Sequence, residues 1–505
     1  MGKTESKQEE KRERQKPGVR QWIYGTIASI CTLLFVIWTG YWAVLILIPV
    51  FIDIYITKYI NWGGWKNAKN PQTRKILDWV DAILFALVGV YFINTFFFQN
   101  YQIPSSSLEK SLLVGDFLCV SKLSYGARSP ITPLSMPLMQ HTFPILGIKS
   151  YSETPQLDYK RFAGGDTIKR YDIVVFNYPS GDTVAMNKQD ADYYTLCKAY
   201  GREIVWSNRA EFGDIIYRPV DRRENYVKRC VGLPGEILEM KDDIVYINGK
   251  PLESPENMQL RYIVQTDGTP ISEKVFEELG ISVDDYMAYT ETGQRVVSFF
   301  KPMDMQNADS LTLSSVGFKN KDGNFGIAYD IPLTKEMIGK LQEKPFVMTI
   351  FGYNEFCKKI GKKRDTRYDF VYPITYRQDS YASDFPAIWI PKRGVTLKFE
   401  NNAEYNYAAY SRCIKNYEGN DIALRNGKIY INGEQADSYT FKYDYFFMMG
   451  DNRDKSADSR SWGFVPEDHI VGKPLFVWLS LDKDKGWFSG KIRWNRLFTV
   501  GNKDK

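Results

Sequence analysis

Histidine and closely spaced cysteine are scarce in this chain of 505 residues. Only His141 and His469 occur, which excludes a histidine-rich metal site and limits any Ser-His-Asp triad to one of these two. The six cysteines are scattered and form no Cys-x-x-Cys pair, a pattern typical neither of a zinc site nor of a disulfide-rich scaffold. We therefore expect no metal and no cofactor.

A large excess of charge of one sign is also missing. The chain carries 66 basic and 60 acidic residues, a net charge of +6, which is too balanced for a protein whose whole surface binds nucleic acid. Charged residues make up 25% and hydrophobic residues 44%, so wholesale disorder is excluded. Aromatic residues reach 15%, which suits β-strands and membrane interfaces.

Two long apolar runs stand near the N-terminus, at residues 22–57 and 77–98. The second has about the length that crosses a bilayer as one helix. The first would be about 54 Å long as one helix, too long for a single upright span. Thr39-Gly40 near its centre predicts a hairpin of two short helices, of which the second is weakened by Pro49 and Asp53.

The charges around these runs predict their orientation. The tail at 1–21 is rich in Lys and Arg, and the loop at 58–76 contains five basic residues and no acidic one. By the positive-inside rule both face the cytoplasm, so the chain after residue 98 lies on the other side of the membrane. A cleaved signal peptide is disfavoured, because no short apolar run ends in a small-residue cleavage site.

Beyond residue 98 the pattern is mostly β. Strands are predicted at 171–179, 226–233 and 243–249, and a short helix at 271–282. Asn-Gly pairs, which favour tight hairpins, lie at 248–249, 426–427 and 432–433. We expect a core built from 99–250 and 441–505, with an inserted region of unassigned role at 251–440.

Three segments concentrate residues that could carry chemistry. The run 103–126 contains three adjacent serines after a proline, and the run 226–236 places a lysine in an apolar strand. The run 446–466 packs acidic, basic and hydroxyl side chains between two apolar flanks. Each has an ordinary alternative: a surface loop, an edge lysine that reaches water, or a polar loop.

Taken in this order, the three runs resemble the bacterial type I signal peptidases, membrane-anchored serine proteases. The family pattern P-S-x-S-M-x-P-T-L-x-x-G-D is matched approximately at 104–116, a strand box at 170–176, and a lysine box, KRCVGLPG, at 228–235. The last box, GDNRDKSADSR, stands at 450–460. The resemblance implies a signal-peptidase-type β catalytic domain with an inserted second domain, anchored by N-terminal transmembrane helices.

The resemblance also assigns roles residue by residue. Ser107 is the expected nucleophile and Lys228 the general base, with Ser456 orienting the lysine. Ser105 would supply its hydroxyl to the oxyanion hole beside the backbone N–H of Ser107. The remaining matched positions are a supporting ion pair, Asp458 and Arg460, and the substrate-binding residues Ile103, Pro104, Leu108, Leu112, Tyr226 and Val227.

A lysine base must lose its proton near neutral pH, although free lysine holds it to about pH 10.4. Apolar neighbours disfavour the ammonium form, and Tyr226, Val227 and the run 446–449 are of this kind. Three departures from the family pattern stand near the expected site: Leu108 for Met, Lys110-Ser111 for Pro-Thr, and Lys455 for Asn. Lys455 is expected to bring a second ammonium near the site and to lower the pKa of Lys228 further.

The resemblance implies an enzyme of the bacterial cytoplasmic membrane, multi-pass, with its catalytic domain on the extracytoplasmic (periplasmic) side. Its partners would be secretory pre-proteins, cleaved after small residues at Ala-x-Ala-type sites, and the lipid bilayer, with no nucleic acid. A catalytically silent, membrane-tethered binding protein of the same fold is the alternative. The S-x-x-K pattern of penicillin-binding proteins also occurs in the chain, at Ser107–Lys110, but the K-T-G tripeptide that this family needs is missing. His469 is expected to be an exposed surface residue rather than the base of a triad.

One apolar segment, residues 130–148, is interrupted by four prolines, which exclude a regular helix or central strand. It is either a loop packed on the core or a surface that dips into the lipid interface.

Overall fold

The computed structural model of the chain describes residues 17–64, 70–143, 146–281, 287–289, 295–297, 314–315, 317–320, 325–359, 371–373, 383–399 and 402–500. Most of the basic tail and Lys66 and Lys69 of the predicted cytoplasmic loop lie outside these residues. Residue contacts divide the chain into two compact units, Met1–Ile93 and Asn94–Lys505. Residues 251–440 belong to the same unit as the catalytic boxes.

The first apolar run is folded back on itself. Helix α1 (Val19–Thr39) ends at Gly40, whose φ of 72° is left-handed and whose N–H donates to Val36 O. The chain returns through η1 (Trp42–Ile46), α2 (Leu47–Ile52) and the π-helical η2 (Asp53–Thr57). The rings of Tyr24 and Tyr55 lie 6.2 Å apart, so the returning segment packs along α1.

Asp53 begins η2 and does not interrupt the returning segment. Its carboxylate accepts hydrogen bonds from the N–H groups of Tyr59 and Ile60 and from the indole of Trp62. These donors satisfy a polar group that sequence analysis counted against the helix.

Helix α3 (Pro71–Phe96) starts six residues before the predicted span and stops at Phe96, because the next residues enter a strand. Among the described residues, α1 and α3 are long and apolar enough to cross a membrane, whereas the segment Trp42–Thr57 is shorter.

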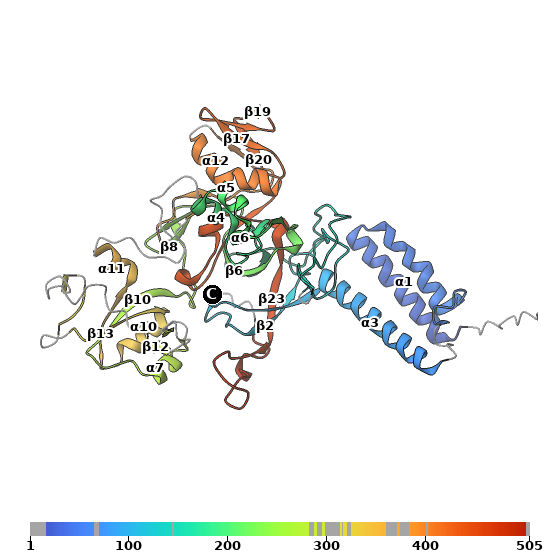
Figure 1. Cartoon of the computed structure of the whole chain (residues 1–505), viewed down its shortest axis with the longest axis horizontal. Coiled ribbons are helices and arrows are strands. Elements are labelled where there is room, and N and C mark those ends of the chain that lie inside the picture. Colours follow the sequence, from blue (N-terminus) through green and yellow to red (C-terminus); the bar gives the residue numbers. More distant parts are fainter. Residues whose placement is uncertain are drawn as a thin grey trace, which may run out of the picture. The chain divides into compact units, whose positions relative to one another are not determined.

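A seven-stranded antiparallel sheet forms the centre of the second unit (Figure 1), in the order β1-β2-β23-β3-β6-β21-β22. Its strands are β1 (Phe98–Gln102), β2 (Asp116–Ser121), β23 (Ile470–Ser480), β3 (Ile173–Asn177), β6 (Asn225–Gly232), β21 (Tyr445–Met449) and β22 (Val465–Pro466). The predicted strands at 171–179 and 226–233 are thus confirmed. They pair directly, with Val174 opposite Lys228.

Both faces of the central strand β3 are buried, which explains its unbroken apolar run. Ile173 and Val175 pack into one apolar cluster, together with Leu118 and Val477. Val174 and Phe176, which alternate with them, pack into a second cluster on the other face.

Two smaller sheets, formed by residues that follow β6 in the chain, pack against the central sheet. One is β15-β7-β8-β9, made of β15 (Ile388–Trp389), β7 (Ile237–Lys241), β8 (Ile244–Ile247) and β9 (Lys250–Pro251). The other is β17-β18-β19, made of β17 (Ile422–Arg425), β18 (Lys428–Ile431) and β19 (Glu434–Gln435). All three Asn-Gly pairs connect neighbouring strands here with positive φ at both residues, so the hairpin predictions are confirmed.

The helix α12 (Ala403–Arg412) and its π-helical extension η6 (Cys413–Tyr417) pack into the same large apolar cluster as these sheets. A two-stranded sheet joins β16 (Thr396–Lys398) to β20 (Ser438–Thr440). Between β3 and β6 the chain forms a separate small cluster from β4 (Thr183–Ala185), α4 (Tyr193–Tyr200), α5 (Arg202–Ser207), α6 (Arg209–Phe212) and β5 (Ile215–Tyr217).

A further sheet, β13-β10-β14, carries its own helices (Figure 1). The strands are β10 (Leu260–Thr266), β13 (Ile327–Leu333) and β14 (Val347–Gly352), and the helices are α7 (Glu273–Glu278), α10 (Lys335–Gln342) and α11 (Tyr353–Lys359). The predicted helix at 271–282 is α7. A hairpin of β11 (Met287–Tyr289) and β12 (Arg295–Val297) lies within this part of the chain.

Short helical turns hold the loops of the second unit: η4 (Ser106–Leu108), η5 (Val220–Arg222), η7 (Arg453–Lys455), α13 (Ser459–Trp462), η8 (Glu467–His469) and η9 (Trp494–Arg496). All six cysteines are free.

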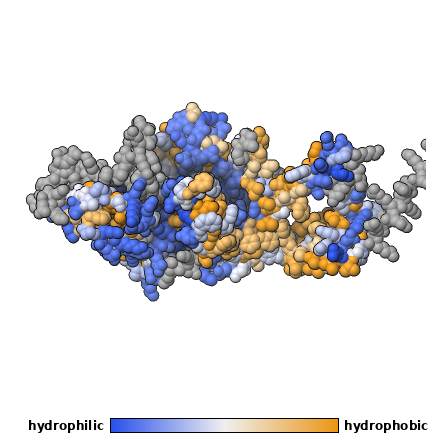
Figure 2. All heavy atoms as spheres, turned by 90° about the horizontal axis from the view of Figure 1, so that it is seen from below, coloured by the Kyte–Doolittle hydropathy of each residue, from blue (hydrophilic) through white to orange (hydrophobic). Residues whose placement is uncertain are grey.

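The segment 130–148 is an irregular loop with large exposed apolar side chains, among them Leu138, which is 77% exposed. Leu134, Met136, Leu146 and Ile148 are exposed as well, whereas Pro144 and Ile145 lie outside the described residues. The face of the molecule in Figure 2 carries both hydrophilic and hydrophobic surface. The loop is therefore not simply packed on the core.

Candidate active site

The turn η4 and the strand β6 bring a serine and a lysine together. Lys228 Nζ lies 2.6 Å from Ser107 Oγ, across 121 positions of sequence. Both residues are buried, with Ser107 7% and Lys228 3% exposed. A short polar contact in a desolvated setting is the geometry that a nucleophile and its base require.

The electrostatic surroundings of Lys228 favour its neutral form. Burial lowers the pKa of Lys228 to about 8. The nearby carboxylates Asp458 and Asp451 act in the opposite direction, because they stabilise the ammonium form. Arg460 adds a smaller repulsion that acts in the same direction as burial. Arg460, which is buried beside the site, is thus a cation that lowers the pKa of Lys228, while Lys455 lies partly exposed at the end of η7.

Gly450 lets the nucleophile turn and the 450–460 loop come into contact. A Cβ at this position would collide with Ser456 Oγ and would lie 2.6 Å from Ser107 O. Glycine is therefore required by this close approach. Ser456 is thus next to the nucleophile, but its hydroxyl faces Ala457 O at 3.5 Å, and among the described contacts it forms no hydrogen bond with Lys228.

Asp458 and Arg460 form a buried bidentate ion pair, with Nε–Oδ1 and Nη2–Oδ2 distances of 2.9 and 2.8 Å. Burial alone would raise the pKa of Asp458, but the charge and hydrogen bonds of Arg460 lower it below its usual value. Asp458 also accepts a hydrogen bond from Gly450 N at 3.1 Å. The ion pair consequently fixes Gly450, against which Ser107 and Ser456 pack.

The expected substrate-binding residues fall into two groups. Ile103, Leu108 and Leu112 are buried in one apolar cluster, against which Val227 packs. Tyr226 lies in another cluster, where its ring centre is 4.6 Å from that of Tyr178 and 5.4 Å from that of Trp462.

The two expected residues just before the nucleophile turn are both at the surface. Pro104 is exposed, as is Ser105. The hydroxyl of Ser105 lies 3.5 Å from Ser107 Oγ, so it is close to the nucleophile.

Sequence analysis missed a second buried ion pair. Arg229 Nε and Nη2 donate to Asp451 at 2.8 and 2.7 Å, and Ser111 Oγ donates to the same carboxylate at 2.6 Å. The network joins β6, the nucleophile loop and the 450–460 loop. The usable signal was an arginine inside an apolar strand, since a buried arginine needs an anionic partner.

Asn452 is a second residue that was missed. Its N–H donates to Ser107 O at 3.1 Å, and its side-chain amide donates to Ser106 O at 3.3 Å. Both bonds hold the carbonyl side of the nucleophile turn, so the backbone N–H of Ser107 keeps a fixed direction.

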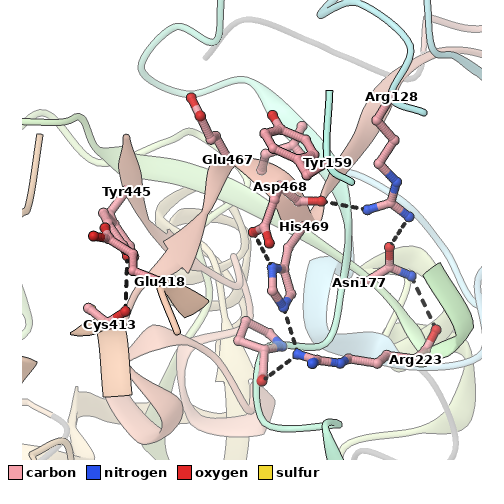
Figure 3. A network of polar contacts seen from close by, with 12 residues as sticks. Arg128, Tyr159, Asn177, Arg223, Cys413, Glu418, Tyr445, Glu467, Asp468 and His469 are labelled. Carbon is pink, nitrogen blue, oxygen red and sulfur yellow. Dashed lines mark hydrogen bonds and ion pairs between the residues drawn. The ribbon is translucent and has the colours of Figure 1, made fainter. Parts of the chain in front are cut away.

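The position expected for His469 was wrong. The residue is 1% exposed, and its two ring nitrogens contact Asp468 at 2.5 Å and Arg223 at 2.7 Å. Figure 3 shows this network together with Arg128 and Asn177. Burial lowers the pKa of His469, so the neutral ring bridges a carboxylate and a guanidinium, and the imidazole does not take part in the Ser107 site. The short η8 turn folds it inward, against Tyr417.

Known proteins share this sequence pattern. Residues 76–277 and 439–479 match the model of a family described as signal peptidase, peptidase S26. Signal peptidase I of Buchnera aphidicola subsp. Baizongia pistaciae is 23% identical over 429 residues, which cover 85% of each chain. Signal peptidase I of Haemophilus influenzae is 21% identical over 444 residues, 86% of this chain and 78% of that protein.

Identity rises where the match is short: signal peptidase I of Helicobacter pylori strain J99 is 51% identical over 90 residues, 16% of this chain and 31% of that protein. Both pieces of the family match contain boxes that meet around the Ser107–Lys228 contact. The resemblance drawn from those boxes is confirmed: over these residues the chain is similar to the signal peptidase family, peptidase S26.

Proposed function

We propose that the protein is a membrane-bound serine endopeptidase that removes N-terminal signal peptides from exported pre-proteins after small residues. The observation that carries the proposal is the buried 2.6 Å contact between Lys228 Nζ and Ser107 Oγ. The name of these relatives, signal peptidase I, supports the substrate class.

In the proposed reaction, neutral Lys228 takes the proton of Ser107 Oγ, which attacks the carbonyl carbon of the scissile bond. The hydroxyl of Ser105 and the N–H of Ser107 stabilise the oxyanion. The Lys228 ammonium then protonates the leaving amine, and water attacks the acyl-enzyme with Lys228 again as base. Ser456 supports the lysine by its position, and the Asp458–Arg460 pair supports Gly450 beneath the site.

Small side chains at the cleavage site fit the proposed pocket residues. Leu108, which follows the nucleophile directly, packs in one apolar cluster with Ile103, Leu112 and Val227. We assign the same role to Pro104 and Tyr226.

The setting we propose is the bacterial cytoplasmic membrane, with α1, the returning segment and α3 inserted in the bilayer. The chain after α3 then lies on the extracytoplasmic side, as the basic loop before α3 favours. We also propose that 251–440 contains an insertion in the catalytic fold, since the family match omits residues 278–438.

The decisive experiment compares wild type and Ser107→Ala on a secretory pre-protein in detergent. We expect complete loss of processing, because the described site offers no second hydroxyl with a base in contact. Ser438→Ala, on the exposed strand β20, serves as the matched control and is expected to process normally. If neither wild type nor Ser107→Ala processes any pre-protein, the alternative of a silent tethered binding protein of the same fold is favoured.

A further inference from the structure

We propose that the sheet β13-β10-β14 and its helices act as a brace for the nucleophile loop, with Lys110 as the positioning residue that connects them. The brace is defined as residues 260–281 and 325–359. This inference rests on the proposed function, because it concerns how Ser107 is held for catalysis.

The first connection runs through the 450–460 loop. Gln259, just before β10, forms a parallel bridge with Asn452: its N–H donates to Asp451 O at 2.9 Å, and its carbonyl accepts from Arg453 N at 3.1 Å. The N–H of Arg261 donates to Asp454 Oδ2 at 3.0 Å. The same loop holds the nucleophile turn through Asn452, so the strand β10 is connected to the turn by a short chain of hydrogen bonds.

The second connection is made by Lys110, three positions after the nucleophile. Lys110 Nζ donates to Leu279 O at 3.0 Å and also to Gly280 O. These carbonyls belong to the turn that ends α7. Phe276 and Leu279 of that helix end pack in one apolar cluster with Val264 of β10.

The two connections close a ring. It runs from the Ser107 turn through Lys110 to α7, across the apolar cluster to β10, and back through Gln259 and Asn452 to the turn. Both catalytic loops are therefore attached to one packed body, which restricts their relative movement.

The backbone of Lys110 agrees with this role. Its φ is 72°, in the left-handed region, whereas proline, which the family pattern has here, is fixed near −65°. The conformation is unfavourable for a residue with a Cβ and persists when surrounding contacts hold it. The ammonium contacts with the α7 end are contacts that can hold it.

The test measures kcat and KM for a short peptide with a signal-peptidase cleavage site, using the full chain in detergent. Lys110→Met removes the ammonium but keeps the apolar stem. We expect kcat to fall about tenfold with KM changed less than about twofold, since misplacing a nucleophile slows the chemical step more than it weakens binding. Lys110→Arg should restore most of the loss, because guanidinium can also donate to both carbonyls.

Lys344→Met is the matched control. Lys344 Nζ lies 3.5 Å from a carboxylate oxygen of Glu278, at the end of α7. This exposed pair does not reach the nucleophile loop. We expect wild-type kinetics. Hydrogen exchange supplies a second readout: the amides of Glu109 and Leu112, which close the nucleophile turn, should exchange faster in Lys110→Met only.

Wild-type kcat and unchanged exchange in Lys110→Met would overturn the brace while Ser107-dependent cleavage remained, so the proposed function would stand. A lower melting temperature with unchanged kcat, or failure of Lys110→Arg to restore kcat, would likewise overturn it in favour of a purely structural role. Should Lys110→Met not fold, Lys110→Gln, which keeps a donor of similar length, is measured by the same criteria. If the wild-type protein does not cleave the peptide at all, by contrast, the proposed function itself is refuted.

Discussion

At the scale of single residues, Lys228 combines a requirement of the proposed mechanism with a cost to stability. Its amine is buried near the Tyr226 ring, 5.5 Å from the ring centre, and beside the carboxylate of Asp458. Removal from water disfavours the ammonium more than these partners favour it, so its pKa falls to about 8. The same shift makes two measurable predictions.

The first prediction concerns the pH dependence of cleavage. Only neutral Lys228 can accept the proton of Ser107, so kcat/KM of wild type should rise with pH along an acid limb centred at about 8. Steady-state cleavage of a peptide between about pH 6 and pH 10 measures this limb. An acid limb near about 6.5 would instead indicate a histidine or carboxylate base. Lys228→Arg should be inactive throughout, since guanidinium stays protonated.

The second prediction concerns stability. Because the pKa of Lys228 is lower in the folded state than the ordinary lysine value, the unfolded chain binds more protons between about pH 8 and pH 10.4. The contribution of Lys228 to stability is therefore least favourable below about pH 8 and improves as pH rises. We expect Lys228→Met to be inactive yet about 1–3 kcal/mol more stable at about pH 7.

Denaturant unfolding of the two proteins at about pH 7 and about pH 10 measures this difference. The advantage of Lys228→Met should shrink at the higher pH, where the folded wild type has lost its proton. A stability difference independent of pH would contradict the argument.

At the scale of elements, the loop after β2 is the clearest exposed feature. Its apolar residues Leu134, Leu138 and Leu146 are each more than half exposed, and nothing in the described part of the chain covers them. Exposed apolar patches on a protein anchored in a membrane are plausible contacts with lipid.

The third prediction tests this loop. Replacing Leu134, Leu138 and Leu146 with Ser in the unit Asn94–Lys505 should weaken its binding to liposomes, because less apolar surface enters the interface. Cosedimentation with vesicles measures binding, and peptide cleavage should survive. Ile204→Ser, which changes an exposed residue of α5, is the control. Unchanged binding together with a lower melting temperature would contradict the contact with lipid.

At the scale of the whole molecule, the apolar helices and the catalytic unit have separate physical requirements. α1 and α3 expose apolar side chains along most of their length, as membrane-spanning helices do in the absence of lipid. The unit Asn94–Lys505 buries its apolar residues around a central sheet. The chain therefore consists of apolar helices, which we propose as a membrane anchor, followed by a sheet-based unit, which we propose as the catalytic part.

The fourth prediction concerns topology. Protease added to the outside of intact spheroplasts should digest the unit after α3 and spare the basic loop at 58–76, since positive charge is retained in the cytoplasm. Immunoblotting with an epitope in each region measures the outcome. Protection of the large unit in sealed cells would contradict both the orientation and the proposed substrate.

The sequence by itself determined the features that depend on neighbours along the chain. Hairpins at Asn248-Gly249, Asn426-Gly427 and Asn432-Gly433 follow from the backbone preference of two adjacent residues. The break at Gly40 and the boxes around Ser107 and Lys228 are likewise local patterns, and the boxes sufficed to indicate the family.

Only the tertiary structure decided which distant groups share a site. Arg460 acts on Lys228, His469 is buried, and Lys110 reaches carbonyls that lie 169 and 170 positions away. Charge and spacing along the chain do not give these results, because the energy of a buried charge depends on the partners that folding brings around it.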